Sequence, residues 1–147
     1  MPGLLSNVPQ IVDARTYTLP YFGVTVATVT TAAAVTFSAT EVLGGLILRD
    51  PNGAARADLL PTASAIIGAI NGPFVGLGFE FTIRNTADAA EAITVTTNTG
   101  LTLSGTMTIA QSNTKRFLAV ITAVGGTNGV AAGGDAVTVY SLGTVVH

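Results

Sequence analysis

The sequence predicts an all-β domain: an antiparallel sandwich of the jelly-roll type, with one short helix and an extended N-terminal arm. Three observations favour this class. Apolar and hydroxyl-bearing residues alternate along several short segments, turn signals separate those segments, and only one stretch favours a helix. The 147 residues are enough for one domain with a core. We divide the chain into an arm, residues 1–34, and a sandwich domain, residues 35–147.

The arm is predicted from its prolines. Pro2, Pro9 and Pro20 lack the amide donor that a strand inside a sheet needs, so the front of the arm is expected to be extended. We expect its apolar side chains to anchor it on a neighbouring subunit or another protein surface. The alternative is that it pairs as an edge strand of its own sandwich. The candidate interface residues in the arm are Leu4, Leu5, Val8, Ile11, Tyr17, Leu19, Tyr21 and Phe22.

Strand, turn and helix signals follow the arm. Residues 35–38 alternate in polarity, and "GLILRD" leads into a turn at residues 50–53, where Pro presets φ and Gly accepts positive φ. We read this part as a strand and a turn. The stretch "LLPTASAIIGAINGP" is the helix candidate, near residues 61–70, with Pro61 in its first turn and Gly72 as a stop signal.

Two further segments alternate with period two. In residues 79–84 the aromatic and aliphatic side chains are predicted to face inward and the polar ones outward. In "ITVTTNTGLTLSGTMTIA", residues 93–110, apolar residues occupy odd positions and Thr or Ser even ones. Breaks are expected near residues 98–100 and at Gly105. The stretch is therefore two or three short strands with an uncharged hydroxyl face.

The segment "KRFLAVITAV" carries apolar residues on both faces, which suits a central strand or one covered by a neighbouring subunit. Leu118 and Val120 are therefore further candidate interface residues. The last clear strand is "AVTVYSL". The predicted core residues are Phe79, Phe81, Ile83, Val95, Leu103, Ile109, Phe117 and Val139.

Charged residues are scarce. They make up 10% of the chain, against roughly 25% in an ordinary soluble domain. Six basic and eight acidic side chains on a surface of roughly 7,000 Å² leave gaps as large as the largest apolar patch on a typical monomer. We therefore predict a homo-oligomer, a homotrimer with closed cyclic symmetry. The alternative is a monomer kept in solution by its hydroxyl groups.

Charge and composition disfavour several partners. A net charge of −2 and a pI near 5.0 do not fit a phosphate-binding surface, so no direct contact with nucleic acid is expected. The absence of Cys removes disulfides and thiolate chemistry. The longest apolar runs, "VLGGLIL" and "AIIGAI", fall far below the ~20 residues of a spanning helix, so no membrane is expected. The first residues lack the features of a secretory signal, which predicts synthesis in the cytoplasm.

No residue set predicts catalysis. His147 is the only His, and it is the last residue, which makes a triad or a general base there implausible. Asp88 and Glu91 lie three residues apart, but we interpret them as part of a solvated hairpin tip rather than as a glycosidase pair. The Gly-rich segment 125–134 lacks the Lys-Ser/Thr ending of a phosphate-binding loop. We predict no enzyme and no cofactor.

Three binding alternatives stay open. Asp50, Asp58 and Asp135 lack EF-hand spacing, which still allows a surface Ca²⁺ held by backbone carbonyls. The Thr rows resemble a lattice-binding face, such as one for ice, but Gly100 and Gly105 interrupt them. A carbohydrate site wants exposed Trp or Tyr for stacking on sugar rings, and the chain has no Trp and three Tyr.

Four strings carry a family resemblance: "GGLILRDPNGAARADLLPTASAIIGAI", "GFEFTIRNTADAAEAITV", "SGTMTIAQSNTKRFLAVIT" and "AVTVYSLGT". Together they resemble virion structural proteins of tailed bacteriophages and prophages, over residues 43–144. The resemblance implies a trimeric capsid decoration or cement protein on the virion, with the major capsid protein as partner. The alternative is a head- or tail-fibre domain that binds host glycans. The resemblance transfers no binding site, and residues 1–34 lie outside it.

Overall fold

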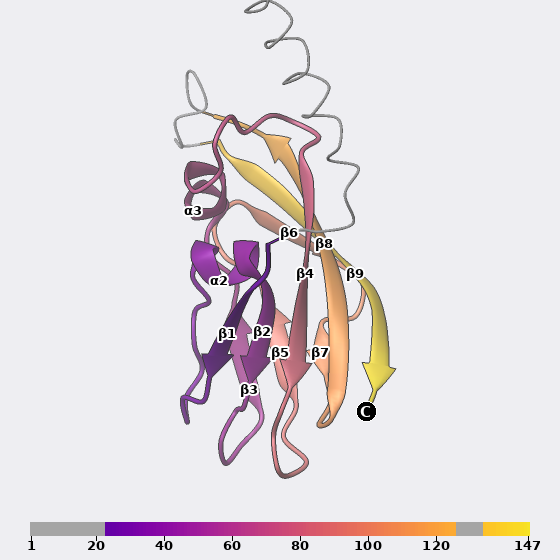
Figure 1. Ribbon diagram of the computed structural model, residues 1–147. Coiled ribbons are helices and arrows are strands. Elements are labelled where there is room, and N and C mark those ends of the chain that lie inside the picture. The colour runs from indigo at the N-terminus through magenta and orange to yellow at the C-terminus, as the bar shows by residue number, and fades with distance from the viewer. Residues whose placement is uncertain (1–22, 126–133) are drawn as a thin grey trace, which may run out of the picture.

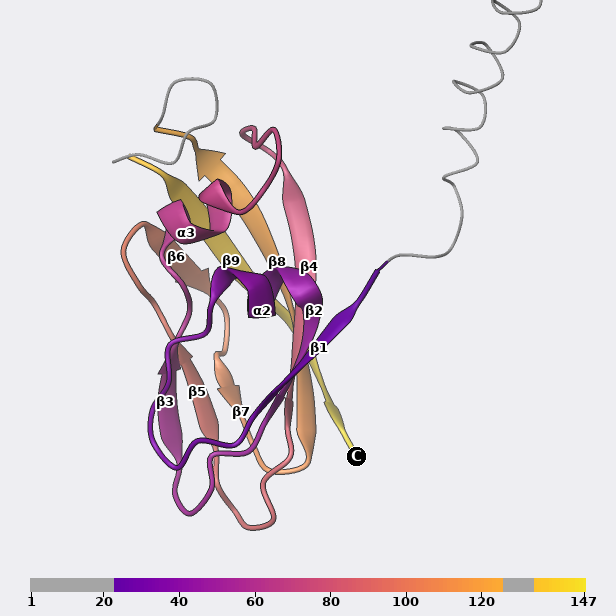
Figure 2. The same cartoon turned by 60° about the vertical axis from the view of Figure 1, so that its left-hand side comes forward.

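The computed structural model describes residues 23–125 and 134–147 (Figure 1). The described residues are mostly β, with 47% strand and 10% helix arranged as two sheets and few helices. The expectation of an all-β fold is confirmed at this level. In Figure 2 the two sheets form separate layers, and both helices lie toward one end of the molecule.

Within the described residues, the larger sheet has six strands in the order β1-β2-β4-β8-β9-β6, and the smaller has three in the order β3-β5-β7. The strands of the larger sheet are β1 (Thr25–Val29), β2 (Gly45–Arg49), β4 (Gly78–Asn85), β8 (Asn113–Ala123), β9 (Ala136–Val146) and β6 (Leu101–Ser104). Those of the smaller sheet are β3 (Arg56–Leu59), β5 (Ile93–Thr96) and β7 (Thr108–Ile109). The helices are α2 (Ala39–Gly44) and α3 (Ala63–Gly68).

The prediction of an antiparallel sandwich is wrong in its strand directions. The pairs β1-β2, β2-β4, β3-β5 and β6-β9 are parallel, whereas β4-β8, β8-β9 and β5-β7 are antiparallel. The larger sheet is therefore mixed, and the jelly-roll topology, which is built from antiparallel strands, is not confirmed. The physical reason is that period-two alternation assigns a side chain to a face but says nothing about the direction of the neighbouring strand.

Helix α3 confirms the predicted helix near residues 61–70, in a shorter form. Thr62 is its N-cap, and the Thr62 hydroxyl accepts a hydrogen bond from the Ala65 amide at 3.1 Å. Pro61 therefore lies just before the cap instead of in the first turn. The helix ends at Gly68, before the expected stop at Gly72.

Helix α2 interrupts the strand that we predicted from residue 35 onward. Its N-cap is Ser38, whose hydroxyl accepts from the Glu41 amide, while the Glu41 carboxylate accepts from the Ser38 amide at 2.7 Å. This reciprocal pair is a capping box, for which the Ser-x-x-Glu spacing is the signal. Gly45 closes the helix with φ of 98°, in the left-handed region that favours glycine. Residues 35–38 alternate in polarity, so the sequence favoured a strand at the position where the helix begins.

The expected strand breaks and the central strand are confirmed. Gly100, with φ of 80°, lies between β5 and β6, and Gly105, with φ of 98°, follows β6. Strand β8 contains most of the two-sided apolar segment and lies between β4 and β9. Its apolar residues on both faces therefore fit a central position in the sheet.

The core lies between the two sheets. The larger sheet contributes Phe81 and Phe117, whose rings stack with centroids 5.0 Å apart, and the smaller contributes Ile93, Val95 and Ile109. Six predicted core residues are buried, each at most 2% exposed: Phe81, Ile83, Val95, Ile109, Phe117 and Val139.

Phe79 and Leu103 are only partly buried, although both pack against the core. They occupy the two ends of one inward-facing row that runs across β4, β8, β9 and β6. Leu103 belongs to the edge strand β6. Phe79 has no strand beside it on the other side, because the pairing of β2 with β4 starts only at Thr82. A core position at the end of such a row keeps part of its surface in water.

The segment 23–34, which the sequence-based division assigned to the arm, belongs structurally to the sheet region. Residues 25–29 form β1 and pair with β2 in register from Thr25 opposite Gly45. The carbonyls of Thr31 and Ala33 accept hydrogen bonds from Arg49 at 2.9 and 2.7 Å. This part of the chain is therefore tied to the folded domain as an edge strand and its connection.

Candidate functional site

The candidate site is the face of the larger sheet that points away from the core, called here the outer face. The strand registers show which residues belong to it. Leu46, Thr82 and Arg116 lie opposite one another on three neighbouring strands. Each is next in sequence to a buried residue, such as Ile47 after Leu46 and Phe117 after Arg116. Successive residues of a strand point to opposite faces, so the residues between core positions point outward. The apolar side chains of the outer face are Val26, Leu46, Leu48, Leu118, Val120, Tyr140, Leu142 and Val145.

The most exposed of these side chains lie near the two edges of the sheet, on β1 and β9. Val26 on β1 is 52% exposed, and Tyr140, Leu142 and Val145 on β9 are 40%, 47% and 61% exposed. The candidates Leu118 and Val120 lie between these strands, on β8, and are half-buried. The β9 residues were not among the predicted interface residues. Their signal was present in "VYSLGTVV", where apolar residues occupy both parities.

Few charges interrupt the outer face. Arg116 pairs with Glu80 on the neighbouring strand at 3.0 Å, and both side chains are more than half exposed. Arg84 is also exposed on this face. The basic dipeptide at residues 115–116 is therefore divided between the two sides of the sheet, since Arg116 points outward and Lys115 points inward.

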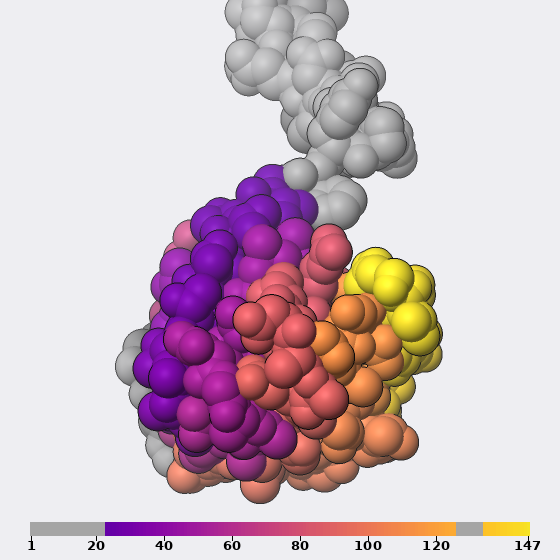
Figure 3. Space-filling model, turned by 90° about the horizontal axis from the view of Figure 1, so that it is seen from below, coloured from indigo at the N-terminus to yellow at the C-terminus, as the bar shows by residue number. Residues whose placement is uncertain are grey.

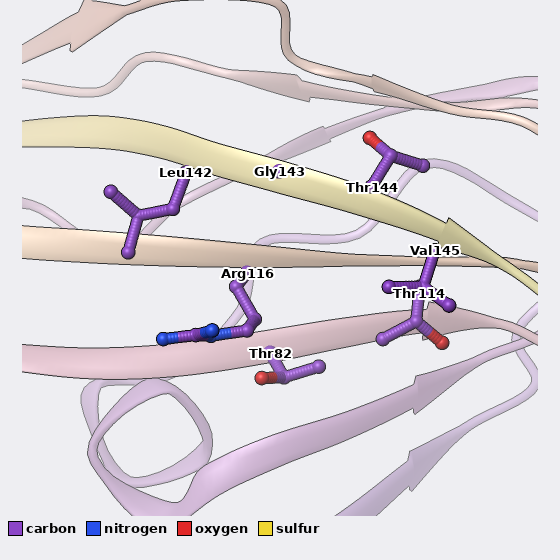
Figure 4. Close-up of a pocket in the computed structure, with 7 residues that line it drawn as sticks. All are labelled: Thr82, Thr114, Arg116, Leu142, Gly143, Thr144 and Val145. Atoms are coloured by element: carbon purple, nitrogen blue, oxygen red, sulfur yellow. The ribbon is translucent and has the colours of Figure 1, made fainter.

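A hollow of about 260 Å³ lies on the outer face where β9 bulges (Figure 4). Between the pairs Ser141–Phe117 and Gly143–Arg116, Leu142 is the extra residue on β9. A Cβ added at Gly143 would meet no atom within 4 Å, so the missing side chain leaves the space open. The hollow is smaller than the roughly 300 Å³ at which small-molecule sites begin.

Asp88 and Glu91 have different surroundings. Asp88 is exposed, as predicted, but Glu91 is only 8% exposed, which corrects the expectation of a solvated tip for this residue. The Gly53 amide donates to Glu91 Oε1 at 2.9 Å, while Glu91 Oε2 has no hydrogen-bond partner among the described residues. The β2–β3 turn therefore covers Glu91. Figure 3 shows this end of the molecule from below, with the turns packed side by side.

The three aspartates considered for Ca²⁺ take separate structural roles. Asp58 is buried against Arg49, Asp50 Oδ1 accepts from the Asn52 amide at 2.9 Å, and Asp135 Oδ1 accepts from the Gly125 amide at 2.7 Å. In residues 23–125 and 134–147, no group of three or more His, Cys, Asp or Glu residues is placed to hold a metal ion.

His147 lies at the end of β9 and is exposed. Its amide donates to the Ser112 carbonyl at 2.9 Å, and its ring contacts the Thr114 hydroxyl. These contacts fasten the last residue to β8. Most of the Gly-rich segment, residues 126–133, lies outside the described residues.

Lys115 is the one lysine of the chain, and its ammonium group lies inside the sheet layer. Nζ donates to the carbonyls of Thr106 and Thr108 at 2.6 and 2.8 Å. Desolvation by burial lowers the pKa of Lys115 below its ordinary value. The contacts place the charge beside β7 and keep it away from the outer face.

The other candidate interface residues fall outside the part of the chain that the structure describes. They are Leu4, Leu5, Val8, Ile11, Tyr17, Leu19, Tyr21 and Phe22.

Comparison with known proteins finds no matching family model, no matching curated protein and no matching solved structure. Among the described residues, no helix has both the length and the apolar character needed to cross a bilayer.

Proposed function

We propose that this chain is a non-enzymatic virion structural protein that binds the outside of a phage capsid as a decoration or cement protein, in a closed homo-oligomer such as a trimer. One structural observation carries the proposal: the outer face of the larger sheet is broad, rich in exposed apolar side chains and poor in charge. The resemblance to tailed-phage virion proteins supplies the virion context.

The size of the outer face supports a protein partner. Strands lie about 4.8 Å apart and rise about 3.4 Å per residue, so six strands over about eight residues present roughly 700 Å². A stable protein interface buries about 800 Å² on each partner. Apolar side chains occupy part of this area, and exposed apolar patches larger than a few hundred Å² on a soluble protein mark interaction sites. The outer face is therefore large enough for one complete interface.

The architecture also suits a mechanical role. The outer face belongs to a sheet that packs through a shared core on a second sheet, and a preorganised surface of this kind loses little ordering entropy when it docks. Hydroxyl groups of Thr82, Thr114 and Thr138 lie among the apolar side chains and can exchange hydrogen bonds with a partner backbone. The proposed partners are the major capsid protein and other copies of this chain, at the capsid surface.

A binding experiment with a matched pair of variants tests the proposal. Leu118→Asp places a charge at the centre of the outer face, whereas Thr108→Asp places one on an exposed position of the smaller sheet. We expect the wild type and Thr108→Asp to sediment with empty capsids of the same virus, and folded Leu118→Asp to stay in the supernatant. Equal sedimentation of both variants would contradict the proposal.

A second candidate function is adhesion to host glycans as a fibre domain. Tyr140 favours it, because this ring is 40% exposed on the outer face and offers a surface on which a sugar can stack. A glycan array distinguishes the two candidates. Binding that is lost in Tyr140→Ala, together with no binding to empty capsids, would favour adhesion over decoration.

A further inference from the structure

Most sheet edges of this fold are protected against pairing with another strand. Along β3, the Phe37 amide donates to the Leu59 carbonyl at 2.9 Å, and the Leu59 amide donates to the Val35 carbonyl at 2.8 Å. The segment before α2 therefore occupies this edge. Free strand edges are templates for pairing with other chains, and proteins usually cover or charge them.

The edges at β6 and β7 are protected by other means. Beside β6, the Leu101 amide donates to the Asn98 carbonyl at 3.0 Å, and the Thr97 hydroxyl donates to the Leu101 carbonyl at 2.9 Å. Beside β7, the Lys115 ammonium binds two carbonyls of residues 106–108. A turn thus covers part of one edge, and a positive charge blocks the other.

Among residues 23–125 and 134–147, nothing protects the edge at β1 in a comparable way. The Asp50 amide donates to the Val29 carbonyl at 2.9 Å, so Val29 directs its backbone groups toward β2. Because these directions alternate along a strand, the amides and carbonyls of Val26 and Thr28 point away from β2. No described residue hydrogen-bonds to them. Residues 23–40 contain neither a charge nor a proline that would discourage pairing.

Strand β1 is complementary to a second copy of itself. In an antiparallel pair with Ala27 on a two-fold axis, Val26 of one copy lies opposite Thr28 of the other. Both residues carry the outward-directed backbone groups, so each such pair can exchange two hydrogen bonds. On the outer face, Val26 would pack beside Thr28, in a β-branched cross-strand pair that stabilises sheets.

We propose that two copies of this chain associate through antiparallel β1–β1 pairing, which joins the two larger sheets into one continuous sheet. Figure 2 shows β1 at the side of the larger sheet. This contact is made by the backbone groups of the β1 edge, at the margin of the outer face, and it involves no capsid, so it does not rest on the proposed function. Two-fold pairing of this kind is the commonest closed symmetry of soluble oligomers.

Cysteine cross-linking tests the pairing directly, since the chain contains no Cys. Ala27 on the axis is a non-hydrogen-bonded pair, with Cα atoms about 4.5 Å apart, within the range of about 4.4–6.8 Å that a disulfide spans. We expect Ala27→Cys to form a covalent dimer under mild oxidation. Thr102→Cys, on the exposed side of β6, is the control and is expected to cross-link at least tenfold more slowly.

An edge-blocking variant makes the test specific. The Val26 amide points away from β2, so Val26→Pro removes an outward donor and leaves the β1–β2 ladder intact. Added to Ala27→Cys, it should abolish the covalent dimer with an unchanged circular dichroism spectrum. In the cysteine-free chain, light scattering should show that Val26→Pro halves the particle mass. Val26→Ala also loses the Val side chain from the outer face but keeps the amide, and it should leave the mass unchanged.

Two outcomes overturn the proposal. One is a rate of cross-linking for Ala27→Cys equal to that of Thr102→Cys. The other is a particle mass that Val26→Pro leaves unchanged while the variant stays folded. The mass comparison needs no cysteine variant, so it decides the question even if Ala27→Cys does not fold.

Discussion

Arg49 Nε donates to Asp58 Oδ2 at 2.7 Å, and this ion pair, with both side chains 0% exposed, connects the end of β2 in the larger sheet to β3 in the smaller. Arg49 also binds the carbonyls of Thr31 and Ala33, and Asp58 Oδ1 accepts from the Val35 amide at 2.9 Å. One buried pair therefore holds both sheets and the segment that leads from β1 to α2.

Removing one partner of this pair should be costly. Asp58→Ala leaves the Arg49 guanidinium buried without its counter-ion, and we expect a loss of about 3–5 kcal/mol in the free energy of unfolding. Urea denaturation measures it. Glu80→Ala, which breaks the exposed pair with Arg116, is the control and should cost at most about 1 kcal/mol. Equal losses in the two variants would contradict the structural role of Asp58.

Phe81 should be a large contributor to core stability. Its ring is 1% exposed and stacks on Phe117, so Phe81→Ala creates a cavity and should cost about 3–5 kcal/mol. Phe74 is 57% exposed, and Phe74→Ala should change the stability by about 0.5 kcal/mol or less. A loss below about 1 kcal/mol for Phe81→Ala falls outside the range for a buried Phe and would reverse the assignment of faces.

Lys115 should titrate below the ordinary range of lysine. Burial disfavours the charged ammonium in the folded state, so the unfolded chain binds this proton more tightly. The free energy of unfolding should therefore rise with pH between the lowered pKa and the ordinary lysine pKa. Since the chain has one lysine, the ¹³Cε signal reports this pKa without ambiguity. Lys115→Met should lack that part of the rise, and a normal pKa in the folded protein would contradict the burial.

The intact chain should be an oligomer at micromolar concentration. Val26, Leu142 and Val145 are all about half exposed or more, and association would remove this apolar surface from water. Light scattering should give a mass above that of the 14.8 kDa monomer. A stable monomer that persists as the concentration is raised would count against self-association through the outer face and against the β1 pairing.

Deleting residues 1–22 should leave a folded domain. Strand β1 begins at Thr25, and none of the six strands of the described larger sheet starts before it. We expect the circular dichroism spectrum to be retained while capsid binding or oligomerisation is lost, because the apolar anchors of the arm are absent. A truncated chain that fails to fold would show instead that these residues complete the domain.

The sequence alone determined the faces of the strands and several breaks between them. Phe81 and Ile83 were assignable to the core because a strand alternates with period two, whatever lies beside it. Gly100 and Gly105 marked ends of strands because positive φ favours glycine. These features depend on a few neighbouring residues, so a local pattern is enough to identify them.

The tertiary structure alone decided which strands are neighbours and in which direction they run. It also decided the burial of Glu91 beneath the β2–β3 turn and the pairing of Arg49 with Asp58 across the two sheets. The outer face belongs to the same class, because Val26 and Val145 share it only once the strands between them are in register. Each of these contacts joins residues whose proximity depends on the pairing of whole strands, and a period-two pattern contains no information about that pairing.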